Sequence, residues 1–161
     1  AAPRHEAAAS ITSTTDAKGQ KVSTEYDVIG RQVRRWLGDV TTGVKLTELT
    51  YDSTPLPDGS PAIGQLSTST RYTGGKAYTV AVTGYDNRYL VLGRRWSIPD
   101  GENGIAGTYD FSYTYDAAGH QITATYPATG GLPAETATKH HPGPRFSDTL
   151  TAEDNYSTAT R

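Results

Sequence analysis

The chain contains no cysteine and no methionine among its 161 residues, and it has no long uninterrupted run of apolar residues. Without cysteine, disulfide bonds and cysteine-ligated metal centres are excluded. A membrane-spanning helix needs about 18 or more largely apolar residues in a row, so the sequence predicts no membrane span. The apolar core of a signal peptide is also missing, because Arg4, His5 and Glu6 interrupt the N-terminal segment.

An excess of charge of either sign is also absent. The formal net charge is −2, and only 20% of the residues are charged. Because domains that bind nucleic acid usually carry a basic patch, the sequence predicts no nucleic-acid partner. The small arginine clusters at residues 31–35 and 94–95 are interpreted as solvated strand faces that contact the tyrosines.

Large aliphatic side chains are scarce, and only 35% of the residues are hydrophobic. What the chain has in quantity is threonine and tyrosine, with 11 Tyr against 2 Phe. Both types suit a pleated, half-buried strand surface, so the composition favours an all-β fold. Folding must offset a large loss of conformational entropy. We therefore expect this segment to rest on neighbouring parts of a larger β-surface.

Alternation of polar and apolar residues, broken by Gly, Asp and Pro, predicts a series of antiparallel hairpins. The clearest strand is Tyr109–Tyr115, which carries an aromatic residue at every second position. Prolines and glycines mark residues 53–63, 99–107 and 127–134 as loops. The remaining expected strands are Lys21–Tyr26, Arg31–Leu37, Lys45–Tyr51, Gln65–Tyr72, Ala77–Tyr85, Leu90–Ile98 and His120–Tyr126.

A short turn sequence repeats along the chain. Tyr26-Asp27-Val28-Ile29-Gly30-Arg31 and Tyr115-Asp116-Ala117-Ala118-Gly119-His120 share the form Y-D-x-x-G-[R/H], and residues 15–20 repeat it with Thr in place of Tyr. Asp can cap a turn through its carboxylate, and Gly accepts a positive φ without steric cost. Tyr51-Asp52 is expected to open the proline-containing loop. Tyr85-Asp86 is expected to open a longer turn that closes at Gly93-Arg94.

These copies, set among Thr- and Tyr-rich alternating strands, resemble the Rhs/YD-repeat family, in particular its actinobacterial wall-associated members. The resemblance covers roughly residues 12–136. It implies a β-ribbon that winds into a large hollow shell, which encloses a toxic domain or is presented at the cell surface. Because 161 residues are too few to enclose such a cavity, we expect one stretch of shell wall.

The resemblance implies a non-enzymatic, structural role in a secreted or cell-surface protein, with no cofactor. The expected partners are neighbouring repeats of a larger chain or an encapsulated toxin domain. We expect residues 1–11 to form a flexible tail, residues 12–136 to form the hairpin region and residues 137–161 to form a weakly patterned C-terminal segment. A small sandwich or an open barrel is the alternative fold if the domain is self-sufficient. The expected structural turn residues are Tyr26, Asp27, Gly30, Arg31, Tyr85, Asp86, Gly93, Tyr115, Asp116 and Gly119.

Two other functions stay open. A small β-domain could bind a carbohydrate or a cell-wall polymer through exposed aromatic rings, and the candidates are Trp36, Trp96, Tyr78 and Tyr109. A polysaccharide hydrolase would need two carboxylates flanking a sugar, and its candidates are Glu25, Glu48, Asp86 and Asp110. The sequence has no nucleophile-elbow motif and no metal-ligand spacing, so we expect no metal site.

Overall fold

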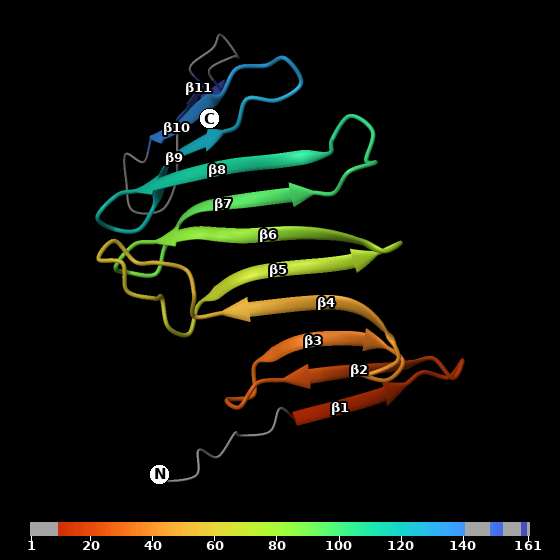
Figure 1. Cartoon of the computed structure of the whole chain (residues 1–161). Helices are drawn as coiled ribbons and strands as arrows, with labels where there is room; N and C mark the ends of the chain where they lie inside the picture. Colours follow the sequence, from red (N-terminus) through yellow and green to blue (C-terminus); the bar gives the residue numbers. More distant parts are fainter. Residues whose placement is uncertain (1–9, 141–148, 153–158, 161) are drawn as a thin grey trace.

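The computed structural model describes residues 10–140, 149–152 and 159–160, and these form one antiparallel β-sheet. Twelve strands lie side by side in the order in which they occur in the sequence (Figure 1). The strands are β1 (Ser10–Thr15), β2 (Lys21–Tyr26), β3 (Gln32–Leu37), β4 (Val44–Tyr51), β5 (Leu66–Thr73), β6 (Lys76–Tyr85), β7 (Val91–Ile98), β8 (Gly107–Tyr115), β9 (Gln121–Tyr126), β10 (Glu135–His140), β11 (Thr149–Ala152) and β12 (Ala159–Thr160).

The predicted all-β array of antiparallel hairpins is confirmed, and the sheet is a single open layer. It neither closes into a barrel nor folds onto a second sheet, so the sandwich or open barrel is not the observed arrangement. The scarcity of large aliphatic side chains explains this, because a second layer would need an apolar interior. Among the described residues no helix is long and apolar enough to cross a membrane.

The strand boundaries modify the expected segments at both ends of the chain. Strand β1 begins at Ser10, so the last two residues of the expected tail belong to the sheet, and residues 1–9 lie outside the described residues. Strand β10 crosses the expected boundary at residue 136 and continues the sheet into the C-terminal segment. Strands β11 and β12 extend the sheet further, and the rest of that segment is not described.

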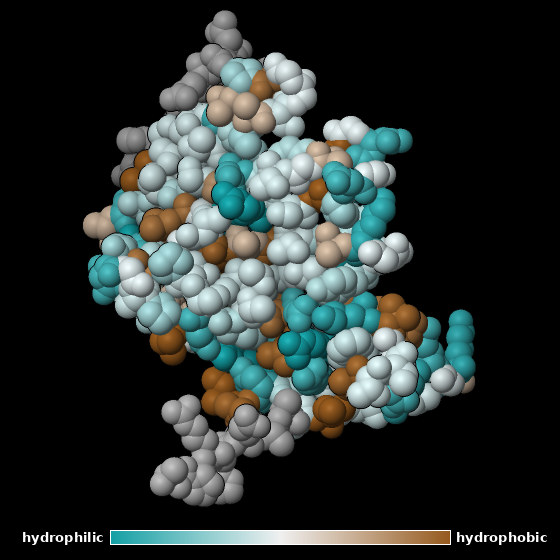
Figure 2. Space-filling view, in the orientation of Figure 1, coloured by the Kyte–Doolittle hydropathy of each residue, from teal (hydrophilic) through white to brown (hydrophobic). Residues whose placement is uncertain are grey.

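The two faces of the sheet carry different side chains. Residues directly opposite each other in neighbouring strands share a face, so the register assigns each residue to one face or the other. One face, here called the threonine face, carries four cross-strand threonine pairs, whose hydroxyl oxygens lie 2.6–3.0 Å apart: Thr50–Thr68, Thr70–Thr79, Thr114–Thr123 and Thr125–Thr136. The other, here called the aromatic face, carries the opposed residues Val80, Trp96 and Tyr109, with Phe111 beside them. Figure 2 shows apolar residues in small separate patches among polar ones.

Most of the small buried core lies beneath the long loop between β4 and β5. Within the described residues the buried hydrophobic residues are Ala62 of this loop, Tyr85 of β6 and Ala124 of β9. The hydroxyl of Thr54 donates to the carbonyl of Val82 in β6, which fastens the loop to the sheet. The N–H of Tyr85 donates to the carbonyl of Pro55 in the same loop.

Candidate functional site

The repeated turn has one hydrogen-bonding pattern in its four compact copies. The N–H of the aspartate donates to the carbonyl of the residue four positions on, at 2.9–3.0 Å, and the carboxylate Oδ1 accepts the N–H of that same residue at 2.8–2.9 Å. The residue three positions after the aspartate, which is the glycine of the motif in three copies, donates its N–H back to the aspartate carbonyl. The aspartates concerned are Asp16, Asp27, Asp86 and Asp116. The predicted capping role of Asp is therefore observed in every compact copy.

The glycine position of these turns requires a left-handed backbone. Gly30 has φ 84° and Gly119 has φ 90°, as the turn chemistry predicts. In the copy that begins at Asp86, the position is filled by Tyr89, which holds φ 62°. Tyr89 keeps that conformation because its neighbours, Arg88 and Leu90, both donate their N–H to the Asp86 carboxylate.

The prediction that this turn closes at Gly93 is wrong. The turn closes at Leu90, and Gly93 lies buried within β7, opposite Gly84 of β6. The sequence prediction sought the next glycine after Asp86, whereas the structure tolerates a tyrosine at the left-handed position.

The loop that begins at Asp52 is the same turn with a long insertion. The N–H of Asp52 donates to the carbonyl of Gln65, and the N–H of Gly64 donates to the Asp52 carboxylate. Gly64 holds φ 85° immediately before the closing residue, as Gly30 and Gly119 do. The proline-containing stretch between these ends folds over β6. The backbone hydrogen bond of the compact turns is kept, but the carboxylate accepts the N–H of Gly64 and not that of the closing residue, and Asp52 itself holds φ 64°.

All the Tyr-Asp turns lie on the same side of the sheet, where β2, β4, β6 and β8 end (Figure 1, left). This row of strand ends, comprising residues 26–31, 51–65, 85–90 and 115–120, is here called the turn edge. Each tyrosine ends an even-numbered strand, and three of them reach back across the preceding strand. Tyr51, Tyr85 and Tyr115 donate their hydroxyls to the carbonyls of Gln32, Leu66 and Val91, at 3.0, 2.8 and 2.8 Å respectively. Each acceptor is the first residue of the preceding strand, so the hydroxyl ties the two ends of one hairpin together.

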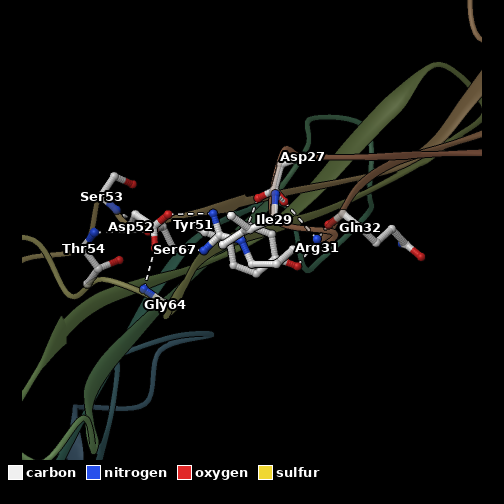
Figure 3. Close-up of polar contacts among 10 residues, drawn as sticks. All are labelled: Asp27, Ile29, Arg31, Gln32, Tyr51, Asp52, Ser53, Thr54, Gly64 and Ser67. Carbon is white, nitrogen blue, oxygen red and sulfur yellow. Dashed lines mark hydrogen bonds and ion pairs between the residues drawn. The ribbon is translucent and has the colours of Figure 1, made fainter. Parts of the chain in front are cut away.

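Arginine side chains join one turn to the next. Arg31 donates to the Asp27 carboxylate within its own turn and makes a bidentate ion pair with Asp52 in the following turn, at 2.9 and 2.7 Å (Figure 3). Its guanidinium also lies over the ring of Tyr51, 4.4 Å from the ring centroid. Arg88 repeats the link further along the edge by donating to the carbonyls of Asp116 and Ala117.

These contacts make the turn-edge carboxylates more acidic. The hydrogen bonds from the Arg31 side chain and the Gly64 N–H hold the pKa of Asp52 below its ordinary value. For Asp27, loss of hydration raises the pKa, but the hydrogen bonds from Arg31 and Ile29 outweigh it, so the pKa is lowered. The pKa of Asp116 is lowered as well, chiefly by hydrogen bonds from His120.

We expect acid to unfold the protein in a defined range. A carboxylate with a lowered folded-state pKa stabilises the fold fully above its unfolded pKa and loses that contribution as the pH falls through the folded value. The pKa values of Asp27 and Asp52 lie below their ordinary value of 3.8. The pKa of Glu48 falls from 4.5 to about 2. The melting temperature should therefore be level near neutral pH and fall steadily between about pH 4.5 and about pH 2.

Circular dichroism melts across this range measure the effect. Asp52→Asn is the matched variant, because it removes one carboxylate while keeping the side-chain shape. It should lower the melting temperature at neutral pH and make the acid-induced decrease smaller. A melting temperature that stays level down to about pH 2 would contradict the role of these ion pairs.

The aromatic candidates for carbohydrate binding do not form one group. Trp96 and Tyr109 are directly opposed on the aromatic face, and Tyr78 lines the same hollow as Trp96. Trp36 lies apart, on the threonine face near Lys45, whose ammonium is 5.5 Å from its ring centroid. The indole nitrogen of Trp36 is buried without a hydrogen-bond partner. Three of the four candidates therefore share a surface, and Trp36 does not.

The carboxylates considered for sugar hydrolysis are all engaged in ion pairs or turns. Arg34 bridges Glu25 at 3.1 Å and Glu48 at 2.7 Å. The hydrogen bond from Arg34, with smaller ones from Tyr72 and Lys45, lowers the pKa of Glu48 to about 2. Asp110 pairs with Arg95, and Asp86 caps its turn. A general acid needs a raised pKa, so Glu48 is unsuited to that role.

Sequence reasoning missed several residues that matter at these two places. At the turn edge it identified Asp52 as the start of the proline-containing loop, but it omitted Gly64 and Tyr89, which hold the left-handed positions before the closing residues. On the aromatic face it omitted Arg71 and Phe111, which lie beside the predicted rings. No family model matches the chain, and no curated protein matches it either.

Proposed function

We propose that this chain is a non-enzymatic structural segment of an exported or cell-surface Rhs/YD-repeat protein. Its sheet would continue into neighbouring repeats and serve as scaffold for toxin encapsulation or for cell contact. The observation that carries the proposal is the turn edge, where tyrosine hydroxyls join the two ends of single hairpins and the side chains of Arg31 and Arg88 join one turn to the next. These contacts make the strand ends rigid, as the wall of a shell requires. They also engage the turn-edge carboxylates in hydrogen bonds and ion pairs, so these carboxylates are not free to act on a substrate.

The thin core supports the same proposal. A single sheet with two solvated faces buries little apolar area. The three buried hydrophobic residues in the part of the chain that the structure describes are too few to offset the conformational entropy of so many ordered residues. Repeat architectures solve this by stacking units, because each unit gains stability from its neighbours. The resemblance carried by the Tyr-Asp turns adds the prediction that the neighbours are further YD repeats.

The intact mass of the native polypeptide tests the proposal. An antibody against the loop at residues 53–63 should detect, in the cell-surface or secreted fraction, a product much larger than 17.2 kDa. The 161-residue chain produced alone should then melt at a lower temperature than the same segment within that product. A native product of 17.2 kDa that melts cooperatively by itself would contradict the proposal.

A second candidate function, carbohydrate binding, is favoured by a separate observation. Trp96 is 45% exposed although it lies in the middle of the sheet, and hollows of about 270 and 300 Å³ flank it. An exposed indole with open space on both sides is suited to stack on a flat ligand.

A further inference from the structure

The hollow of about 270 Å³ beside Trp96 has a cation at its border. Arg71 of β5 lines it together with Ser69, Tyr78 and Val80. Arg71 is exposed, and it lies directly opposite Tyr78 on the aromatic face. The hollow therefore combines an indole, a phenol ring and a guanidinium within a few side chains of one another.

Charge is divided between the two faces of strands β3–β8. Arg35 and Arg71 are both opposed to Thr47 of β4, and Arg94 is opposed to Phe111 of β8, so all three arginines lie on the aromatic face. The acidic residues of the same strands, Glu48 and Asp110, lie on the threonine face, where they pair with Arg34 and Arg95. The aromatic face of these strands therefore carries positive charge without acidic residues of its own.

An acidic residue of the loop between β7 and β8, Glu102, contacts Tyr78 at the border of the hollow, and its charge is paired with that of Lys76. Glu102 accepts hydrogen bonds from the ammonium of Lys76 at 2.8 Å and from the hydroxyl of Tyr78 at 2.6 Å. These contacts also hold the Tyr78 ring in place at the border of the hollow. Tyr78 thus offers a ligand its ring rather than its hydroxyl.

We propose that the aromatic face binds an acidic polysaccharide, with one sugar ring stacked on Trp96 and its carboxylate paired with Arg71. The proposal deepens the second candidate function and is independent of the scaffold role. The electron-rich face of an indole attracts the C–H groups on the flat side of a sugar ring. A guanidinium binds a carboxylate through two parallel hydrogen bonds. Trp96 would therefore bind the ring of a uronic acid, and Arg71 would bind its carboxylate.

A chain of sugars fits the surface better than one sugar does. Trp96 and Ile98 line both hollows, so the indole stands as a ridge between them. The second hollow, bordered by Ile105, Tyr109 and Phe111, is largely apolar and would receive the next ring along the polymer. The edge-on contact of Phe111 with Trp96, at a centroid distance of 6.5 Å, supports the indole in its exposed position.

Titration of the 161-residue chain with a short oligogalacturonate, and in parallel with its carboxyl-reduced neutral counterpart, tests the proposal. Tryptophan fluorescence and calorimetry are the readouts. The acidic oligomer should quench the fluorescence and bind at least about tenfold more tightly than the neutral one. Trp96→Ala should weaken binding of the acidic oligomer about tenfold or more. Arg71→Gln should remove the preference for the acidic oligomer.

Arg95→Gln is the matched control, because Arg95 precedes Trp96 in β7 but points to the threonine face, where it pairs with Asp110. It should leave binding unchanged. Equal binding of the neutral oligomer would overturn the acidic specificity while leaving carbohydrate binding itself in place. Equal binding of a polyglutamate peptide would assign the face to acidic peptides and overturn the proposal. Absence of binding, or binding that survives Trp96→Ala, would overturn both the proposal and the second candidate function.

Discussion

Replacing Gly93 with alanine should destabilise the protein by about 3 kcal/mol. A β-carbon at this position would lie 2.5 Å from the hydroxyl of Thr83 and 2.9 Å from the carbonyl oxygen of Phe111. The hydroxyl can rotate away, but the carbonyl belongs to the backbone of the next strand and cannot move without breaking the β7–β8 pairing. The free energy of unfolding in urea measures the loss.

Two other glycines serve as controls for this prediction. Gly84 is the cross-strand partner of Gly93, but a β-carbon there would meet Leu92 at an ordinary 3.8 Å, so Gly84→Ala should change stability little. Gly30 has open space around it and φ 84°, so Gly30→Ala should cost roughly 1 kcal/mol from backbone strain alone. Equal losses for Gly84→Ala and Gly93→Ala would contradict the close-approach explanation.

The position of Gly93 shows why some of the structure could not be read from the sequence. Strand β6 has an irregular register between Val82 and Gly84, and Thr83 has no partner in β7 at that point. This irregularity sets the Thr83 side chain against the backbone of Gly93. Since a bulge depends on pairing between strands, no local pattern around Gly93 distinguishes it from a turn glycine.

Local features were predictable because their causes are local. Alternation in Tyr109–Tyr115 marks a strand, and the half-buried and exposed positions of β8 alternate as expected. The aspartate caps and the left-handed glycines at residues 30 and 119 follow from the chemistry of five successive residues. The hydrogen bonds of Tyr51, Tyr85 and Tyr115 join residues 19–24 positions apart, so they become visible only when the hairpins pack side by side.

The same division applies to the candidate site on the aromatic face. The sequence indicated Tyr78, Trp96 and Tyr109 as possible ring platforms, but it could not place them on one face, because that depends on the register of three strands. Arg71 was not considered, because it and Trp96 lie in strands that do not pair with each other. Arg71 lies opposite Tyr78, and Trp96 lies opposite Val80, in the intervening strand β6. Register depends on pairing between distant segments. A sequence can therefore indicate which residue types suit a site, but it cannot show which of them lie on the same face.

Replacing Tyr85 with alanine should give the largest loss among side-chain truncations at the turn edge, about 3–5 kcal/mol. Tyr85 is 4% exposed beneath the loop that carries Ala62, and its hydroxyl donates to the carbonyl of Leu66 at 2.8 Å. Truncation removes a buried ring from a very small core and leaves that carbonyl without its tyrosine partner. The free energy of unfolding in urea again provides the measurement.

Tyr85→Phe separates the two contributions, because it keeps the ring and removes the hydroxyl. We expect it to cost about 1–2 kcal/mol, the penalty for removing the tyrosine partner of the half-buried Leu66 carbonyl. Tyr126 is the control, since this residue is 46% exposed, and Tyr126→Ala should cost about 1 kcal/mol or less. If Tyr85→Phe were as damaging as Tyr85→Ala, the hydroxyl bond between the ends of the hairpin would be the main source of stability. If it were neutral, the tyrosine would act only through its ring, and the argument that hydroxyl bonds rigidify the turn edge would fail.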